Sequence, residues 1–138
     1  MNKLRKIKLD EFLLAFNQLV KFHHDSDDPL PVIGDMEKLK AALDYPFQSV
    51  FGKSLFPGFY NKAACYFYGF SKGHIFENGN KRCGVLSVNL FYELNGRECP
   101  LATDDMYSLA KYIANSDPAK KDKAIKTVAA ILRTNYWE

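Results

Sequence analysis

The chain has 138 residues, 47% of them hydrophobic, and a formal net charge of +3. This length suits one domain with a substantial hydrophobic core, and we expect a single domain over residues 1–138. The charge excess is too small to indicate nucleic-acid binding without a clustered basic face, so no nucleic-acid partner is expected. No apolar run is long enough to span a membrane, so we do not expect the protein to have a membrane as a partner.

The three cysteines, Cys65, Cys83 and Cys99, are odd in number and match no metal-ligand spacing. Free thiols in a reducing cytoplasm are therefore expected. Cys83 follows Arg82 at an expected helix start, where the pKa of a thiol could fall. We favour the simpler interpretation that Cys83 is a small residue facing the core.

The first half of the chain predicts two helices followed by an irregular segment. Apolar residues at helical spacing predict an amphipathic helix over residues 10–22, and turn residues and prolines end it. A second helix is expected over residues 35–43, with Asp35 as its N-cap. Its inward side chains are expected to be Met36, Leu39 and Leu43. Residues 44–55 mix aromatic and β-branched residues with Pro and Gly, which predicts an irregular hairpin or exposed flap.

The second half predicts four more helices. Residues 59–71 and 80–94 are apolar over most of a helical circumference, which is typical of buried helices. Gly73 is expected to end the first of these and Asn95-Gly96 the second. Two further helices are expected over residues 103–113 and 122–132. The predicted fold class is all-α, a compact helical bundle with a loop between two buried central helices.

That loop carries the strongest chemical signal, the run His-Ile-Phe-Glu-Asn-Gly-Asn-Lys-Arg-Cys at residues 74–83. His74 can exchange a proton near neutral pH. The sequence Gly79-Asn80 at a helix start allows a sharp turn that aims free backbone N–H groups at an anion. Lys81 and Arg82 add two positive charges. The run therefore predicts a base placed before a phosphate-binding turn, and Phe76 is expected to point inward and hold the loop.

This run resembles the signature of the Fic/Doc family. It matches at the histidine, the phenylalanine and the Gly-Asn-Lys-Arg turn, that is at His74, Phe76, Gly79, Asn80, Lys81 and Arg82. It departs at Asn78, where the family has an acidic residue. The order of segments over most of residues 29–96 is similar to that of Doc-type toxins, the short branch of the family.

The resemblance implies a role for each motif residue. His74 would be the catalytic base, the Gly79-Asn80-Lys81-Arg82 turn would bind nucleotide phosphates, and residue 78 would bind Mg²⁺. The implied co-substrate is ATP, with Mg²⁺ as cofactor. Asn78 offers Mg²⁺ only a neutral oxygen, which weakens the expected metal site. The family's flap is implied to register the target protein by adding a strand.

Lys81 distinguishes the branches, because typical adenylyl-transferring Fic proteins have glycine at this position. The Doc-type resemblance implies a toxin that transfers a phosphoryl group from ATP to a Ser/Thr hydroxyl of a target protein. Elongation factor Tu is the implied target, and blocked translation the implied outcome. Two alternatives stay open: an AMP-transferring Fic enzyme, and a catalytically weak nucleotide-binding or partner-binding module in which Asn78 replaces the metal-binding acid.

Control of the activity has two candidate forms. Self-inhibited family members carry a Ser/Thr followed four residues later by Glu and then by Gly or Asn. Thr134 and Glu138 fit this spacing, but Glu138 is the last residue of the sequence and the final position is missing. We prefer restraint by a separate small antitoxin, with Glu138 as the alternative self-inhibitory residue.

Overall fold

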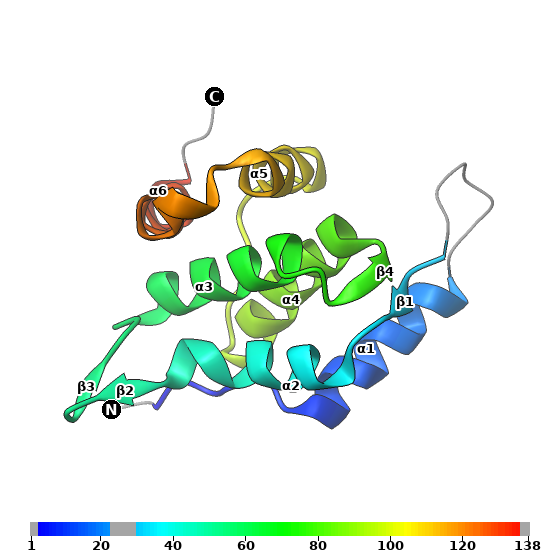
Figure 1. Ribbon diagram of the computed structural model, residues 1–138, viewed down its shortest axis with the longest axis horizontal. Coiled ribbons are helices and arrows are strands. Elements are labelled where there is room, and N and C mark those ends of the chain that lie inside the picture. Colours follow the sequence, from blue (N-terminus) through cyan, green and yellow to red (C-terminus); the bar gives the residue numbers. More distant parts are fainter. Residues whose placement is uncertain (1–2, 23–29, 136–138) are drawn as a thin grey trace.

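The computed structural model describes residues 3–22 and 30–135, and in that part of the chain it has six α-helices and two short antiparallel sheets (Figure 1). The helices are α1 (Leu9–Lys21), α2 (Met36–Asp44), α3 (Phe59–Lys72), α4 (Asn80–Leu94), α5 (Thr103–Asn115) and α6 (Lys121–Thr134). Two 3-10 turns, η1 (Tyr45–Phe47) and η2 (Pro118–Lys120), follow α2 and precede α6. The predicted all-α class is confirmed, and no helix in the described ranges combines the length and hydropathy needed to cross a membrane.

The pair α3 and α4 forms the centre of the fold. In Figure 1, α5 and α6 cover one side of this pair, and α1 and α2 cover the other. Nearly the whole circumference of α3 is buried, as its apolar sequence predicted, since a helix without a polar face must be enclosed by other elements. The loop that joins α3 to α4 therefore begins and ends on the two most enclosed helices.

The predicted helix bounds agree with the structure to within one or two residues, but one inward residue was wrong. The carboxylate of Asp35 accepts a hydrogen bond from the Lys38 backbone N–H at 3.0 Å, so the predicted N-cap is confirmed. Met36 is 39% exposed instead of facing the core. It is the first residue of α2, and a helical side chain leans toward the N-terminus, which here takes it off the end of the helix into solvent. Residues 23–29 of the predicted turn lie outside the described residues.

The predicted hairpin exists, but not beside the motif loop. Strands β2 (Ser49–Val50) and β3 (Lys53–Ser54) pair around the two-residue turn Phe51-Gly52. They lead into the N-terminal end of α3, whereas the motif loop leaves its C-terminal end, about 21 Å away for a helix of 14 residues (Figure 1). The hairpin's position does not fit the implied role of a flap over the motif.

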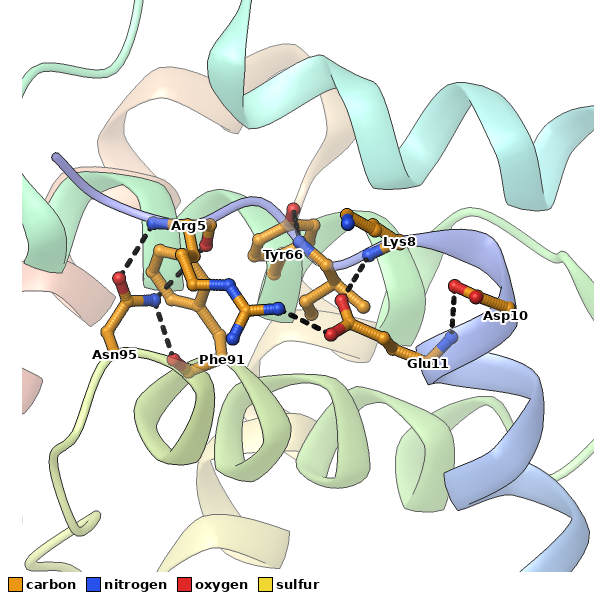
Figure 2. Close-up of polar contacts among 8 residues, drawn as sticks. Arg5, Lys8, Asp10, Glu11, Tyr66, Phe91 and Asn95 are labelled. Carbon is orange, nitrogen blue, oxygen red and sulfur yellow. Dashed lines mark hydrogen bonds and ion pairs between the residues drawn. The ribbon is translucent and has the colours of Figure 1, made fainter.

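The segment before α1 is tied to the central helices by polar contacts (Figure 2). The Asn95 side chain accepts a hydrogen bond from the Arg5 backbone N–H at 2.8 Å and donates to the Arg5 carbonyl at 3.1 Å. Asn95 was predicted only as the end of α4. It also fastens the start of the chain to that end.

Tyr66 joins three segments within the core. Its hydroxyl accepts a hydrogen bond from the Ile7 backbone N–H at 3.2 Å, drawn as a dashed line in Figure 2. The same hydroxyl donates to the Leu43 carbonyl at 2.9 Å. Burial is the main cause that raises the pKa of Tyr66 well above its usual range, so the hydroxyl stays protonated and able to donate.

We predict that Tyr66→Phe lowers the free energy of unfolding by about 1–3 kcal/mol, because it leaves two buried backbone groups without a partner. Tyr92→Phe is the matched control. The Tyr92 hydroxyl is buried and has no hydrogen-bond partner among the described residues, so its removal should be neutral or stabilising. Urea unfolding measures both variants, and equal losses would contradict the role of the Tyr66 hydroxyl.

A second prediction concerns the contact between α3 and α4 at Gly84. A Cβ added to Gly84 would overlap the Ser71 Oγ, and that oxygen is buried without a hydrogen-bond partner in the described part of the chain. Gly84→Ala should therefore cost about 1–3 kcal/mol of unfolding free energy. In Ser71→Ala/Gly84→Ala the oxygen is gone and the next contacts, to Ser71 Cβ and Phe67 Cδ1, are 3.3 and 3.4 Å. The double variant should regain most of the unfolding free energy that Gly84→Ala loses. Urea denaturation that shows no such gain would contradict the steric explanation.

Candidate active site

The loop turns sharply where α3 ends. The Gly73 N–H donates to the Gly69 carbonyl at 2.9 Å, and a side chain at Gly73 would overlap that same carbonyl. His74 follows with a backbone φ of +52°, in the left-handed region that residues other than glycine seldom adopt. Its side chain is exposed. The turn thus lifts the imidazole out of the core and toward solvent.

A pocket of about 410 Å³ adjoins His74. It lies between α3 and the η2–α6 segment, and its lining includes Tyr45, Cys65, Tyr68, Lys72, His74 and Lys121. The Lys121 ammonium donates to the Tyr45 hydroxyl at 3.2 Å and lies 4.5 Å from the centre of its ring. The pocket therefore combines aromatic walls with positive charge, a lining suited to a ligand with a flat ring or an anionic group.

Lys121 was missed as a site residue. The run from Lys120 to Lys123 is rich in charge, and such runs usually form a solvated helix face. In the structure Lys121 is partly buried against the pocket, while Lys120 and Lys123 are exposed. No sequence signal separates one lysine of such a run from its neighbours.

Phe76 lies inside the aromatic core. It is 4% exposed, and its ring centre is 5.7 Å from that of Phe16 and 6.2 Å from those of Phe12 and Phe70. These contacts join the loop to α1 and α3. The side chain occupies the position expected of a residue that holds the loop in place.

A two-stranded sheet fixes the middle of the loop. Strand β4 (Phe76–Asn78) pairs antiparallel with β1 (Val32–Ile33), so that Val32 faces Asn78. The backbone N–H groups of Gly34 and Asp35 both donate to the Ile75 carbonyl, at 2.8 and 3.0 Å. Sequence reasoning missed β1, because a two-residue strand carries no alternating pattern to recognise.

Asn80 has a structural role that was not predicted. Its Oδ1 accepts a hydrogen bond from the Phe76 N–H at 3.1 Å, and its Nδ2 donates to the Phe76 carbonyl at 2.9 Å. The amide therefore closes the loop upon itself. The sequence predicted a phosphate ligand here, and the observed contacts make Asn80 a residue that shapes the turn.

The turn before α4 has the features of an anion site. Gly79 has φ of +83°, and a Cβ there would come within 3.0 Å of the Pro31 ring and 3.3 Å of Arg82 Nη2. No described side chain caps this helix end, so its first N–H groups lack the partner that an N-cap supplies. Lys81 is exposed and has no hydrogen-bond or ion-pair partner in the described ranges. The helix dipole and these cationic side chains favour a bound anion.

The residues at the expected metal position offer few ligands. Within residues 3–22 and 30–135, the structure has no group of three or more His, Cys, Asp or Glu side chains arranged for a metal ion. Asn78 is partly buried on β4, and the exposed Glu77 lies on the other face of the strand because side chains alternate. Glu138, the candidate self-inhibitory residue, lies outside the described residues.

Cys83 behaves as a core residue. Its side chain is fully buried, and burial raises the pKa of its thiol to about 12 in spite of the neighbouring Arg82. The alternative of a reactive thiol with a lowered pKa is wrong, because the Cys83 side chain faces the core even though it lies near the start of α4.

Comparison with known proteins gave one result. The family model described as the Fic/DOC family matches residues 7–92, from the segment before α1 to the last turns of α4. No curated protein and no solved structure gave a match. The matched region contains the whole motif loop, all of α3 and all but the last two residues of α4, and it covers more than half of the sequence. The chain therefore belongs to the Fic/DOC family.

Proposed function

We propose that the chain is a Doc-type transferase that moves the γ-phosphoryl group of ATP to a Ser or Thr hydroxyl of a target protein. Family membership indicates a nucleotide-transferring protein modifier. The observation that carries the proposal is the placing of His74, exposed on a left-handed turn, at one end of a loop whose other end is the N-terminus of α4, which no side chain of the described residues caps. One short, closed loop thus connects an exposed histidine, which we assign as the base, to the helix start that we assign as the phosphate site.

The proposed chemistry follows from these two groups. A protein hydroxyl is a poor nucleophile at its own pKa, so His74 would accept its proton as the hydroxyl oxygen attacks the γ-phosphorus. The bond from that phosphorus to the β,γ-bridging oxygen breaks, and ADP leaves. Negative charge on the transferred oxygens would be stabilised by the N–H groups at the start of α4 and by Lys81 and Arg82.

The position of Lys81 supports phosphoryl over adenylyl transfer. The side chain is exposed at the second residue of α4, next to the helix end where phosphates would lie. Glycine here would leave that space open to the distal phosphates, whereas the lysine side chain fills the space or adds a positive charge to it. A reversed nucleotide would then present its γ-phosphorus to His74. AMP transfer is the alternative if the lysine instead folds away from the turn.

The donor set fits a magnesium ion shared with the nucleotide better than one held by protein alone. Asn78 would supply one neutral oxygen, and the phosphates of ATP together with water would supply the remaining ligands. Bound there, Mg²⁺ would neutralise charge on the phosphates. The same scarcity of ligands favours a second candidate function, a catalytically weak Fic-like module that binds nucleotide or a partner without efficient transfer.

We further propose that the segment before α2 takes the flap role. Leu30 and Val32 are 49% and 42% exposed, and Val32 lies directly opposite Asn78 on the neighbouring strand. A target segment that contacts these side chains would bring its hydroxyl to the motif. Elongation factor Tu is the proposed target and a separate antitoxin the proposed inhibitor, both resting on the Doc-type resemblance.

The experiment that tests the function is intact-mass analysis of elongation factor Tu after incubation with the protein, ATP and Mg²⁺. We expect the target to gain the mass of one phosphoryl group. His74→Asn should slow this transfer by about a hundredfold to ten-thousandfold, because it removes the base. Asparagine is chosen because it tolerates left-handed backbone better than alanine does.

Two controls accompany this variant. Glu77→Gln, on the other face of β4, should leave the rate unchanged, and His74→Asn should keep nucleotide affinity. Full activity of His74→Asn would remove the base assignment. An unmodified target, with nucleotide still bound, would favour the binding module.

Lys81→Gly tests the reaction type. Removing the lysine side chain should abolish phosphoryl transfer and leave the turn open to the distal phosphates. Weak incorporation of AMP from α-labelled ATP should then appear. If the unmutated protein already attaches AMP, the proposed phosphoryl transfer is wrong, although the base and the phosphate turn would keep their roles.

A further inference from the structure

The hairpin at the far end of α3 carries an apolar side chain that contacts almost nothing. Phe51, at the tip of the segment formed by residues 49–55 (here the finger), is 99% exposed. Val50 and Leu55, on the same finger, are 48% and 44% exposed. Three large apolar side chains in water on one short projection form a patch of the kind that marks a contact with another protein.

The backbone at the tip is also strained. Phe51 has φ of +53° and Gly52 has φ of +77°, so both central residues of this two-residue turn are left-handed. Turns of this kind favour Asn-Gly or Asp-Gly, because a bulky side chain is disfavoured at positive φ. Asparagine would therefore suit the fold better than phenylalanine does. Backbone strain at an exposed position is a reason to look for function there.

The finger is held rigidly at its base by a buried lysine. Lys62 is 8% exposed, and its ammonium donates to the Ser54 Oγ at 3.1 Å and to the Phe56 carbonyl at 2.5 Å. It also lies 5.2 Å from the centre of the Phe47 ring. Because Ser54 faces the protein body, Val50 and Lys53, one pair further along the ladder, face away from it. A finger fixed in this way loses little conformational entropy when it binds.

A pocket adjoins the base of the finger. It has a volume of about 440 Å³, and its walls include Leu55, Phe56, Pro57 and Ile125, with Asp122 and Lys126 beside them. A cavity of about 150 Å³ already accepts a benzene molecule, so this pocket has enough volume for a phenylalanine ring. Phe51 does not enter it, since the ring is almost fully exposed.

We propose that this face joins two copies of the chain, each inserting Phe51 into the pocket of the other. A two-fold contact uses the same patch on both partners, so a projecting group and its receptor must lie side by side on one surface, as they do here. The charges agree with this arrangement. The pocket lining includes Asp122 and Lys126, and Asp122 would be the ion-pair partner of Lys53 on the finger of the other copy.

The first test replaces the anchor by the residue that the turn prefers. Sedimentation velocity over a wide dilution series, in reducing buffer, should show a concentration-dependent dimer of the unmutated protein. Phe51→Asn should weaken dimerisation by about a hundredfold, because each dimer loses two anchors worth roughly tenfold each. The same variant should unfold at a higher urea concentration when both proteins are compared as monomers, which excludes misfolding as the cause. Leu14→Gln, at a 64% exposed position on α1, is the control and should dimerise normally.

A complementation test separates reciprocal insertion from any other contact. Leu55→Asp places a charge in the pocket wall but keeps Phe51, whereas Phe51→Asn loses the anchor but keeps the pocket. Each variant alone should be monomeric. Mixed together they should associate more strongly than either alone, because one intact anchor-and-pocket contact is restored. A protein that is monomeric throughout the series, a Phe51→Asn dimer of unchanged strength, or a mixture that gains nothing would each overturn the proposal.

Discussion

The motif loop depends on how closely α3 and α4 approach each other. Gly84 on α4 has no side chain, and the buried Ser71 of α3 takes the space where one would be. This contact lies three residues before His74 and four after Asn80, so the spacing of the two helices sets the distance that the loop must span. The Asn80 amide then ties the Phe76 backbone to the start of α4, and the Phe76 ring fills the aromatic core below. Helix packing, a side-chain amide and a buried ring together give an exposed loop a single shape.

Backbone strain marks two places outside the core. Among the described residues, positive φ at a residue other than glycine occurs at Phe51, His74 and Asn135. Asn135 follows the end of α6, where a left-handed asparagine is ordinary. The other two are an exposed imidazole beside a pocket and an exposed phenyl ring on a rigid finger. Neither side chain gains buried contacts that would offset the strain. A function is the alternative reason for it: we propose that His74 acts as the base and that Phe51 anchors a dimer. They lie at opposite ends of α3, so a dimer joined through the finger leaves the loop accessible to a target.

The sequence predicted those parts of the fold that depend on local periodicity. The six helices, the Asp35 cap, the hairpin and the burial of Cys83 all follow from spacing, turn residues or residue size. It failed where a long-range contact decides. The pairing of β1 with β4 joins residues more than forty positions apart, and Lys121 reaches its pocket only because α6 packs against α3. At the site, the motif predicted which residues take part. The structural role of Asn80, which closes the loop onto Phe76, could be seen only in the structure. A side chain that could bind phosphate and one that closes a loop look the same in sequence.

Asn78 and Lys81 are best considered together. Compared with a motif that has an acid at the first position and glycine at the second, this chain lacks one negative charge and gains one positive charge at the same turn. An acid helps to hold Mg²⁺, which in turn neutralises phosphate oxygens, whereas a lysine neutralises them directly. On the proposed function, Lys81 therefore replaces part of the charge that a tightly held metal would provide. The loss of the acid then weakens metal binding more than it weakens nucleotide binding. On that proposal the neutral Asn78 and the cationic Lys81 offset each other in the electrostatics of the turn, and the enzyme would be an active transferase with a low affinity for Mg²⁺.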